Sequence, residues 1–166
     1  MILGKYGKGY DRMNYLRDLF TNPFVMVPFG SWAEAQVLKM LIHWWVNKKF
    51  DINRLFGDGG MPSGHSATVC SLATITGLMR GFGTFEFAMA FALAVIVCHD
   101  AMGVRLETGK QSMMLNEIIK SFNFLGEKKL PEVKLKEFVG HTPSQVAAGV
   151  LLGICNSLII FFLVLN

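Results

Sequence analysis

The chain has 166 residues, of which 52% are hydrophobic and 17% charged, with a net charge of +4 at pH 7. Soluble domains carry about a quarter charged residues, so this composition excludes an ordinary soluble domain and favours one membrane-embedded domain. The basic residues are scattered between apolar stretches, which argues against nucleic acid as a partner. Their excess instead suits anionic lipid headgroups.

Residues 1–23 precede the first apolar stretch and form a predicted interfacial tail. Its large side chains favour a short helix at the membrane surface; they include Tyr10, Met13, Leu19 and Phe20.

Four apolar stretches follow, at residues 24–46, 61–79, 84–104 and 142–165. The last has 24 residues without Asp, Glu, Lys, Arg or His, enough to cross a hydrocarbon core of about 30 Å. The first is charged and the second is rich in Ser and Thr, so we expect both inside a bundle. The sequence predicts an all-α membrane bundle of about four transmembrane helices with amphipathic surface helices.

Three cysteines fall inside these stretches and lack the spacing of a metal site. We interpret them as small packing residues: Cys70, Cys98 and Cys155.

Residues 106–140 form a polar insert between the last two stretches. Apolar side chains recur in it at helical spacing, at Met114, Ile118, Phe122 and Leu125. An amphipathic helix is therefore expected, lying on the membrane surface, covering a site or forming a dimer contact.

Four spans would place the loops 47–60 and 105–141 on one face of the membrane. That face carries ten Lys and Arg residues and the other face five. The positive-inside rule then predicts that the two large loops are cytoplasmic in a multi-pass cell-membrane protein.

The same topology brings polar groups together whatever the orientation. Four of them meet at one membrane face: Lys39, His65, Arg105 and His141. Gln36, Lys39 and His43 share one helical face through their spacing of three and seven residues, which would look into the bundle. Such convergence of residues far apart in the chain indicates a binding site.

Residues 59–65 read Gly-Gly-Met-Pro-Ser-Gly-His directly before an apolar stretch, and His141 opens the last stretch in the same way. A turn that presents a hydroxyl, backbone N–H groups and an imidazole at a helix start suits a phosphate. The second imidazole gives that phosphate a possible attacking group.

These motifs resemble the type 2 phosphatidic acid phosphatase superfamily, which includes the vanadium haloperoxidases, and most closely its small divergent branch of bacterial membrane proteins. The matching stretches lie in order along most of the chain, at residues 35–39, 59–63, 100–105, 109–111 and 140–143. The resemblance implies a membrane phosphatase that needs no cofactor or metal.

The mechanism that the resemblance implies passes through a phosphohistidine. His141 would attack phosphorus, His65 would protonate the leaving oxygen, and water would release phosphate. The phosphate oxygens would be held by Lys39, Arg105, Ser63 and Gly64. Imidazoles suit both roles because they titrate near neutral pH.

The chain departs from the superfamily pattern at three places. Lys39 is not followed by the usual Arg-Pro pair, since Val46 and Asn47 stand there. Gln111 occupies the usual place of the nucleophile, six residues after the arginine.

The third departure is Gln145, which stands where an aspartate usually orients the nucleophile. A carboxylate-to-amide change in a protease triad costs roughly 10⁴ in rate. Candidate replacement carboxylates are Asp100, Glu107 and Glu117. Thr142 and Gln145 also fit a capping box, a purely structural reading of the same residues.

Three functions remain open from the sequence. The first is a lipid phosphatase acting on a phosphate monoester or diphosphate. The second is a catalytically weak or inactive protein that binds or moves a phospholipid or polyprenyl phosphate. The third is a metal-dependent hydrolase, whose ligands would be His65, His99, Asp100 and His141. Because four spans make a thin bundle, we also expect a homodimer.

Overall fold

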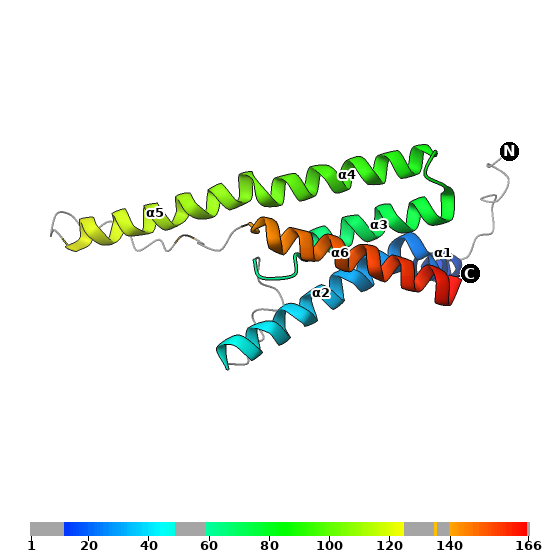
Figure 1. Cartoon of the computed structure of the whole chain (residues 1–166), viewed down its shortest axis with the longest axis horizontal. Coiled ribbons are helices and arrows are strands. Elements are labelled where there is room, and N and C mark those ends of the chain that lie inside the picture. The colour runs from blue at the N-terminus through cyan, green and yellow to red at the C-terminus, as the bar shows by residue number, and fades with distance from the viewer. Residues whose placement is uncertain (1–11, 49–58, 125–134, 136–139, 166) are drawn as a thin grey trace.

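The computed structural model describes residues 12–48, 59–124, 135 and 140–165, and every regular element in that part of the chain is helical. The elements are, in order, α1 (Arg12–Thr21), α2 (Pro23–Asn47), α3 (Gly64–Arg80), α4 (Phe85–Met102), α5 (Val104–Phe124), α6 (Pro143–Ile160) and a π-helical end, η2 (Phe161–Leu165). The predicted all-α class is confirmed. Helices α2, α3, α4 and α6 form one elongated bundle, in which α3 contacts the other three (Figure 1).

The helix starts follow from local capping chemistry. The side chain of Asn22 accepts from the Phe24 N–H, and the Thr84 hydroxyl accepts from the Phe87 N–H. A polar side chain before the first turn satisfies N–H groups that have no partner within the helix. The four bundle helices therefore begin within three residues of the predicted apolar stretches.

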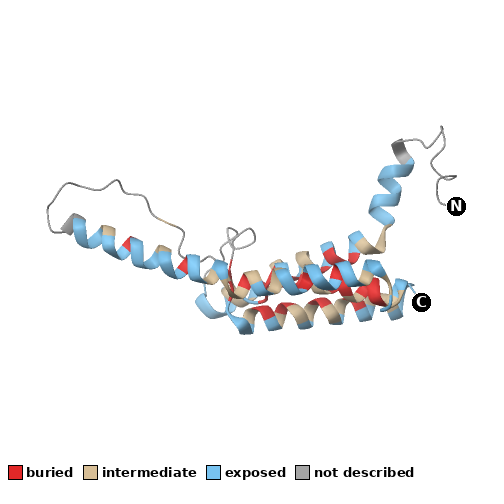
Figure 2. Ribbon diagram, turned by 90° about the horizontal axis from the view of Figure 1, so that it is seen from above, coloured by how far each residue is buried: buried red, intermediate tan, exposed pale blue. Residues whose placement is uncertain are grey.

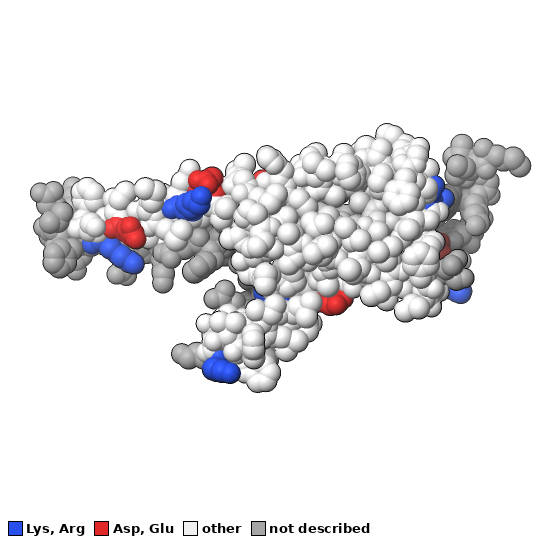
Figure 3. Space-filling model, viewed as in Figure 1, with Lys and Arg blue, Asp and Glu red and all other residues white. Residues whose placement is uncertain are grey.

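Two helical segments are long and apolar enough to cross a membrane: Phe85–Phe122, which joins α4 to α5, and Pro143–Leu165. Helices α2 and α3 occupy the other two predicted spans but do not reach the same combination of length and hydropathy. The count of four spans therefore stays a prediction. Most of the bundle surface is uncharged in Figure 3, and charged side chains gather on α5 and towards the ends of the molecule.

Helices α3 and α6 meet along a seam of small residues, defined on α6 by Gly149, Gly153 and Ser157. All three are buried, at a spacing of four residues. A Cβ at Gly153 would collide with the carbonyl oxygen of Ala67, and the Ser157 hydroxyl donates to the carbonyl of Ser71 at 2.9 Å. Small residues at this spacing allow two helix backbones to approach closely.

The charged first stretch is only partly inside the bundle. Lys39 is buried as expected, whereas Glu34 is exposed on α2. Glu34 nevertheless has a partner, because the Asn156 side-chain amide on α6 donates to its Oε2 at 2.5 Å. A side-chain hydrogen bond thus joins α2 to α6.

The helix expected within the polar insert is present as α5, but it continues α4 away from the bundle instead of lying back over it (Figures 1 and 2). The joined segment has 38 residues, or about 57 Å at the α-helical rise. That is nearly twice a hydrocarbon core of about 30 Å. Asn116 on α5 holds Leu135 through two hydrogen bonds. Its Nδ2 donates to the Leu135 carbonyl at 2.9 Å, and its Oδ1 accepts from the Leu135 N–H at 3.0 Å.

Parts of the predicted surface segments lie outside the described residues. These are Tyr10 in the tail and, in the insert, Leu125 and residues 126–134 and 136–139. Helix α1 accounts for the described part of the tail and exposes Leu19 and Phe20.

Candidate active site

The loop before α3 is shaped by glycine. Gly59 and Gly60 have φ angles of 87° and 91°, a region that side chains with a Cβ rarely adopt. The Met61–Pro62 peptide bond is cis. This turn delivers Ser63 to the first position before α3.

Ser63 caps α3 with its hydroxyl. Its Oγ accepts from the Ser66 N–H at 3.4 Å and from the Ser66 hydroxyl at 3.0 Å, and the residue is fully buried. The hydroxyl therefore caps α3, and its contact with a phosphate stays a prediction. Gly64 is also buried, with Trp32 packed against its α-carbon.

His141 is held by the junction between α4 and α5. Its backbone N–H donates to the carbonyl of Ala101 at 3.0 Å. A Cβ at Gly140 would collide with the backbone of Arg105 and Leu106, so the chain crosses this junction at van der Waals distance. Gly140 has a φ of 91°, which again favours glycine.

The two predicted imidazoles lie together. The ring centroids of His65 and His141 are 6.2 Å apart, with an interplanar angle of 59°. A backbone hydrogen bond from the Ser63 N–H to the Gln145 carbonyl, at 3.0 Å, ties the two motif segments to each other. His141 is 4% exposed and His65 lies at the surface, so a buried imidazole faces an accessible one.

Gln145 contacts the buried imidazole and fixes its tautomer. Its Oε1 accepts from the Thr142 N–H at 3.1 Å and lies 3.3 Å from Nδ1 of His141. Because a backbone N–H can only donate, this atom of Gln145 is the carbonyl oxygen and an acceptor. When the ring is neutral, this contact assigns the N–H to Nδ1 and leaves the lone pair on Nε2. Gln145 thus serves the helix cap and the imidazole together.

Lys39 approaches the same loop from α2. It is 6% exposed, and its side-chain carbons lie close enough that a Cβ at Gly60 would meet Cγ at 3.0 Å. Lys39 also lines a small cavity of about 190 Å³ together with His43, Gly60 and Met61. The predicted helical face of Gln36, Lys39 and His43 therefore looks onto the loop before α3.

Gln36 is a polar group that the motif comparison did not assign to the site. Its Oε1 is buried and accepts no hydrogen bond from the described residues, and its amide carbon would lie 3.9 Å from a Cβ at Gly64. A buried acceptor without a donor is costly, so Gln36 marks a polar position beside the start of α3. Its helical spacing with Lys39 is the sequence signal that points to it.

Arg105 lies in the first turn of α5, beside the backbone of Gly140, and its side chain is exposed. Its Nε donates to Oδ2 of Asp100 at 2.7 Å. Asp100 therefore orients the guanidinium, and Gln145 lies beside the His141 ring.

Comparison with known proteins decides the family. Residues 20–156 match the Divergent PAP2 family. The chain belongs to this family. A relative from Bacillus subtilis (strain 168), named uncharacterized membrane protein YuiD, is 36% identical over 154 residues, which cover 87% of this chain and 98% of YuiD. No solved structure matches the chain. The predicted resemblance is confirmed, and the chain is a membrane protein.

Two further residues complete the account of this Divergent PAP2 site. Gln111, which takes the usual place of the nucleophile, is exposed on α5 six residues beyond Arg105. His99, proposed as a metal ligand, is exposed on α4. Within the described ranges, no three His, Cys, Asp or Glu side chains gather closely enough to hold a metal ion.

Proposed function

We propose that the protein is a metal-independent phosphatase that hydrolyses a lipid phosphate monoester or diphosphate through a phosphohistidine. The observation that carries this proposal is the pairing of His65 with His141, whose ring centroids are 6.2 Å apart. Phosphoryl transfer depends mainly on positioning and charge stabilisation. Two imidazoles at this separation can both reach one phosphoryl group.

In the first step, Nε2 of His141 attacks phosphorus. A nitrogen–phosphorus bond forms while the bond from phosphorus to the leaving oxygen breaks, and the imidazolium of His65 gives its proton to that oxygen. In the second step, the oxygen of a water molecule attacks the phosphorus of the phosphohistidine, and neutral His65 takes a proton from that water. The nitrogen–phosphorus bond then breaks and free phosphate leaves. Gln145 positions His141 in the tautomer that this attack requires.

In this proposal, charge stabilisation of the phosphoryl group falls to the predicted phosphate-binding residues. Arg105 and Lys39 supply positive charge, and the first N–H groups of α3, at Gly64 and His65, supply donors at a helix start. Gln36 accepts a hydrogen bond from a protonated phosphate oxygen, which gives its buried Oε1 a donor. The buried Ser63 hydroxyl shapes this helix start through its cap.

The test measures inorganic phosphate released by the purified full chain in detergent from phosphatidic acid and from prenyl diphosphates. Release is expected to persist in EDTA and to fall to background in His141→Ala. His65→Ala should lower the rate by about 10²–10⁴-fold, the range for loss of a general acid. His99→Ala is the matched control and should leave the rate unchanged. Release that EDTA abolishes, or that His99→Ala abolishes, contradicts the proposal.

A second candidate function is supported by the contact between Gln145 and His141. An amide orients the ring but adds no negative charge to support an imidazolium. We therefore also consider a protein that binds or moves a phospholipid or polyprenyl phosphate without turnover. Binding of a lipid phosphate that is lost in Lys39→Gln, with no phosphate release by the wild type, would favour this function over hydrolysis.

We further propose a multi-pass protein of the cell membrane with the histidine site at the cytoplasmic face, based on the excess of Lys and Arg in the two loops on that side. A cysteine placed at Gln111 should react with an impermeant maleimide in inverted vesicles and stay unlabelled in intact cells. A homodimer is expected alongside, because the bundle is thin, and native mass spectrometry that finds a monomer would contradict it.

A further inference from the structure

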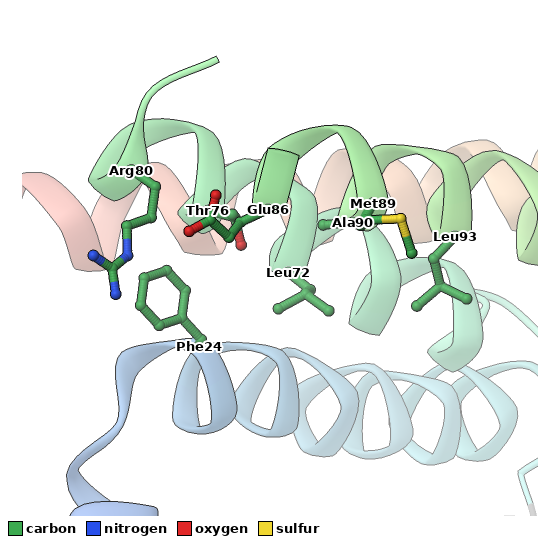
Figure 4. Close-up of a pocket in the computed structure, with 8 residues that line it drawn as sticks. All are labelled: Phe24, Leu72, Thr76, Arg80, Glu86, Met89, Ala90 and Leu93. Carbon is green, nitrogen blue, oxygen red and sulfur yellow. The ribbon is translucent and has the colours of Figure 1, made fainter. Parts of the chain in front are cut away.

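A second recess lies at the other end of α3 from the two histidines. It has a volume of about 440 Å³ and is bounded by α2, α3 and α4 (Figure 4). Arg80, at its mouth, is 15 residues from His65 along α3, which is roughly 22 Å at the α-helical rise. The recess, called here the α2–α4 groove, is therefore separate from the candidate active site.

The floor and walls of the groove are largely apolar, with Thr76 as a polar residue of the lining. Leu72 comes from α3, and Met89 and Leu93 come from α4, with their side chains directed into the space between the helices (Figure 4). From Leu72 to Arg80 the groove runs about 12 Å along α3. One leaflet of a hydrocarbon core of about 30 Å is about 15 Å deep, so the groove matches the depth of a single leaflet.

Two opposite charges stand at the mouth of this apolar groove. The Arg80 guanidinium carbon lies 5.6 Å from the centroid of the Phe24 ring, and Glu86 is in the first turn of α4. Neither charge forms an ion pair with any of the described residues. The positive charge of Arg80 suits the C-terminal end of α3, and the negative charge of Glu86 suits the N-terminal end of α4. The helix dipoles do not explain why both charges border one cavity without forming an ion pair.

The chemistry of the two groups selects a zwitterion. A guanidinium offers a two-point fork for a phosphate, and a carboxylate accepts hydrogen bonds from a primary ammonium. A phosphate-only headgroup would satisfy Arg80 and be repelled by Glu86. The apolar walls below them suit an acyl chain.

We propose that the α2–α4 groove binds one phospholipid with a phosphoethanolamine headgroup, with its phosphate at Arg80, its ammonium at Glu86 and one acyl chain along Leu72, Met89 and Leu93. This site is independent of the proposed phosphatase reaction. The lipid covers the face of α3 that neither α2 nor α4 covers and thereby completes the bundle at this end.

The test compares lipid retention by the purified, delipidated full chain in native mass spectrometry. Equal amounts of phosphatidylethanolamine and phosphatidylglycerol with identical acyl chains are added. The wild type should retain phosphatidylethanolamine about tenfold better, the ratio given by one charge-assisted hydrogen bond. Glu86→Gln should abolish this preference, and Arg80→Gln should lower retention of both lipids. Lys120→Gln, on exposed α5, is the charge-matched control.

A groove-filling variant separates this site from general lipid adhesion. Met89 is 56% exposed at the groove rim, so Met89→Trp can fill the space without entering the bundle core. Retention should be lost while the helical circular dichroism and the phosphate release stay at wild-type levels. Equal retention of the two lipids by the wild type, unchanged retention in Met89→Trp, or cross-linking that places a second copy of the chain in the groove would each overturn the proposal.

Discussion

The α3–α6 seam and the α4–α5 rod are both helical, yet they differ in what holds them. The seam is built from Gly149, Gly153 and Ser157 and leaves no room for a single extra methyl group at either glycine. The rod continues α4 beyond the bundle. Its polar contacts with other segments include that of the Ala101 carbonyl with the His141 N–H and those of the Asn116 amide with the backbone of Leu135. The two imidazoles of the proposed reaction lie at the end of the seam, whereas α5 projects away from it.

The largest effect is expected on stability, when the α3–α6 seam is widened. Gly153→Ala places a methyl group against the Ala67 carbonyl, and overpacking of this kind costs about 1–3 kcal/mol. Gly30→Ala on α2 is the matched control, because a Cβ there meets nothing within 4 Å. Unfolding in detergent, followed by circular dichroism, should show a loss for Gly153→Ala and none for Gly30→Ala. Equal stability of the two variants would contradict the close seam.

The next largest effect is expected on the rate of phosphate release, in variants of Gln145. Gln145→Glu keeps the length and the acceptor oxygen that contacts Nδ1 of His141, and it adds a negative charge beside the ring. A carboxylate supports an imidazolium, so the rate of phosphate release should rise at least about tenfold. Gln145→Leu, which removes the acceptor, should lower the rate. Stopped-flow phosphate detection measures both, and equal rates in the two variants would exclude the positioning role.

The smallest effect is expected on the rod. Asn116→Ala removes both hydrogen bonds to the backbone of Leu135, so the amide of Leu135 should exchange faster with deuterium. Phosphate release should not change, because these bonds lie away from the two imidazoles. Ser121→Ala, which loses a hydrogen bond within α5 itself, controls for general loosening of the helix. A fall in phosphate release in Asn116→Ala would show that the rod supports the site.

Much of the fold could be predicted because the apolar stretches and their caps are local signals. The stretch ahead of Arg80 and the stretch ahead of Arg105 both became helices, each preceded by a polar cap, Ser63 or Thr84. The direction of α5 could not be predicted, since Gly103 resembles a helix end in sequence and the chain nevertheless continues nearly straight through it. The burial of Lys39 beside exposed Glu34 also depends on packing that no single stretch reveals.

For the site, topology alone predicted that His65 and His141 would lie at one end of the bundle, and the structure brings their rings together. The fixed tautomer of His141 could not be predicted, because it depends on Gln145 serving two contacts at once. The four-residue spacing of Gly149, Gly153 and Ser157 was visible in the sequence and is the signal that identifies the α3–α6 seam. The burial of the Gln36 Oε1 without a donor could not be predicted, because the burial of a single atom depends on how the helices pack.

The tight crossing of Gly140 over the α4–α5 junction explains how His141, the nucleophile of the proposed reaction, can stand 36 residues from Arg105 instead of six. This close backbone contact fixes the position of His141, so the number of residues between Arg105 and His141 does not determine where the imidazole lies. Added residues between α5 and Gly140 would cost loop-closure entropy, which grows slowly with length, and would leave the imidazole where it is. The segment between α5 and Gly140 can therefore change in length during evolution, while the contact of Gly140 with the α4–α5 junction keeps His141 in place.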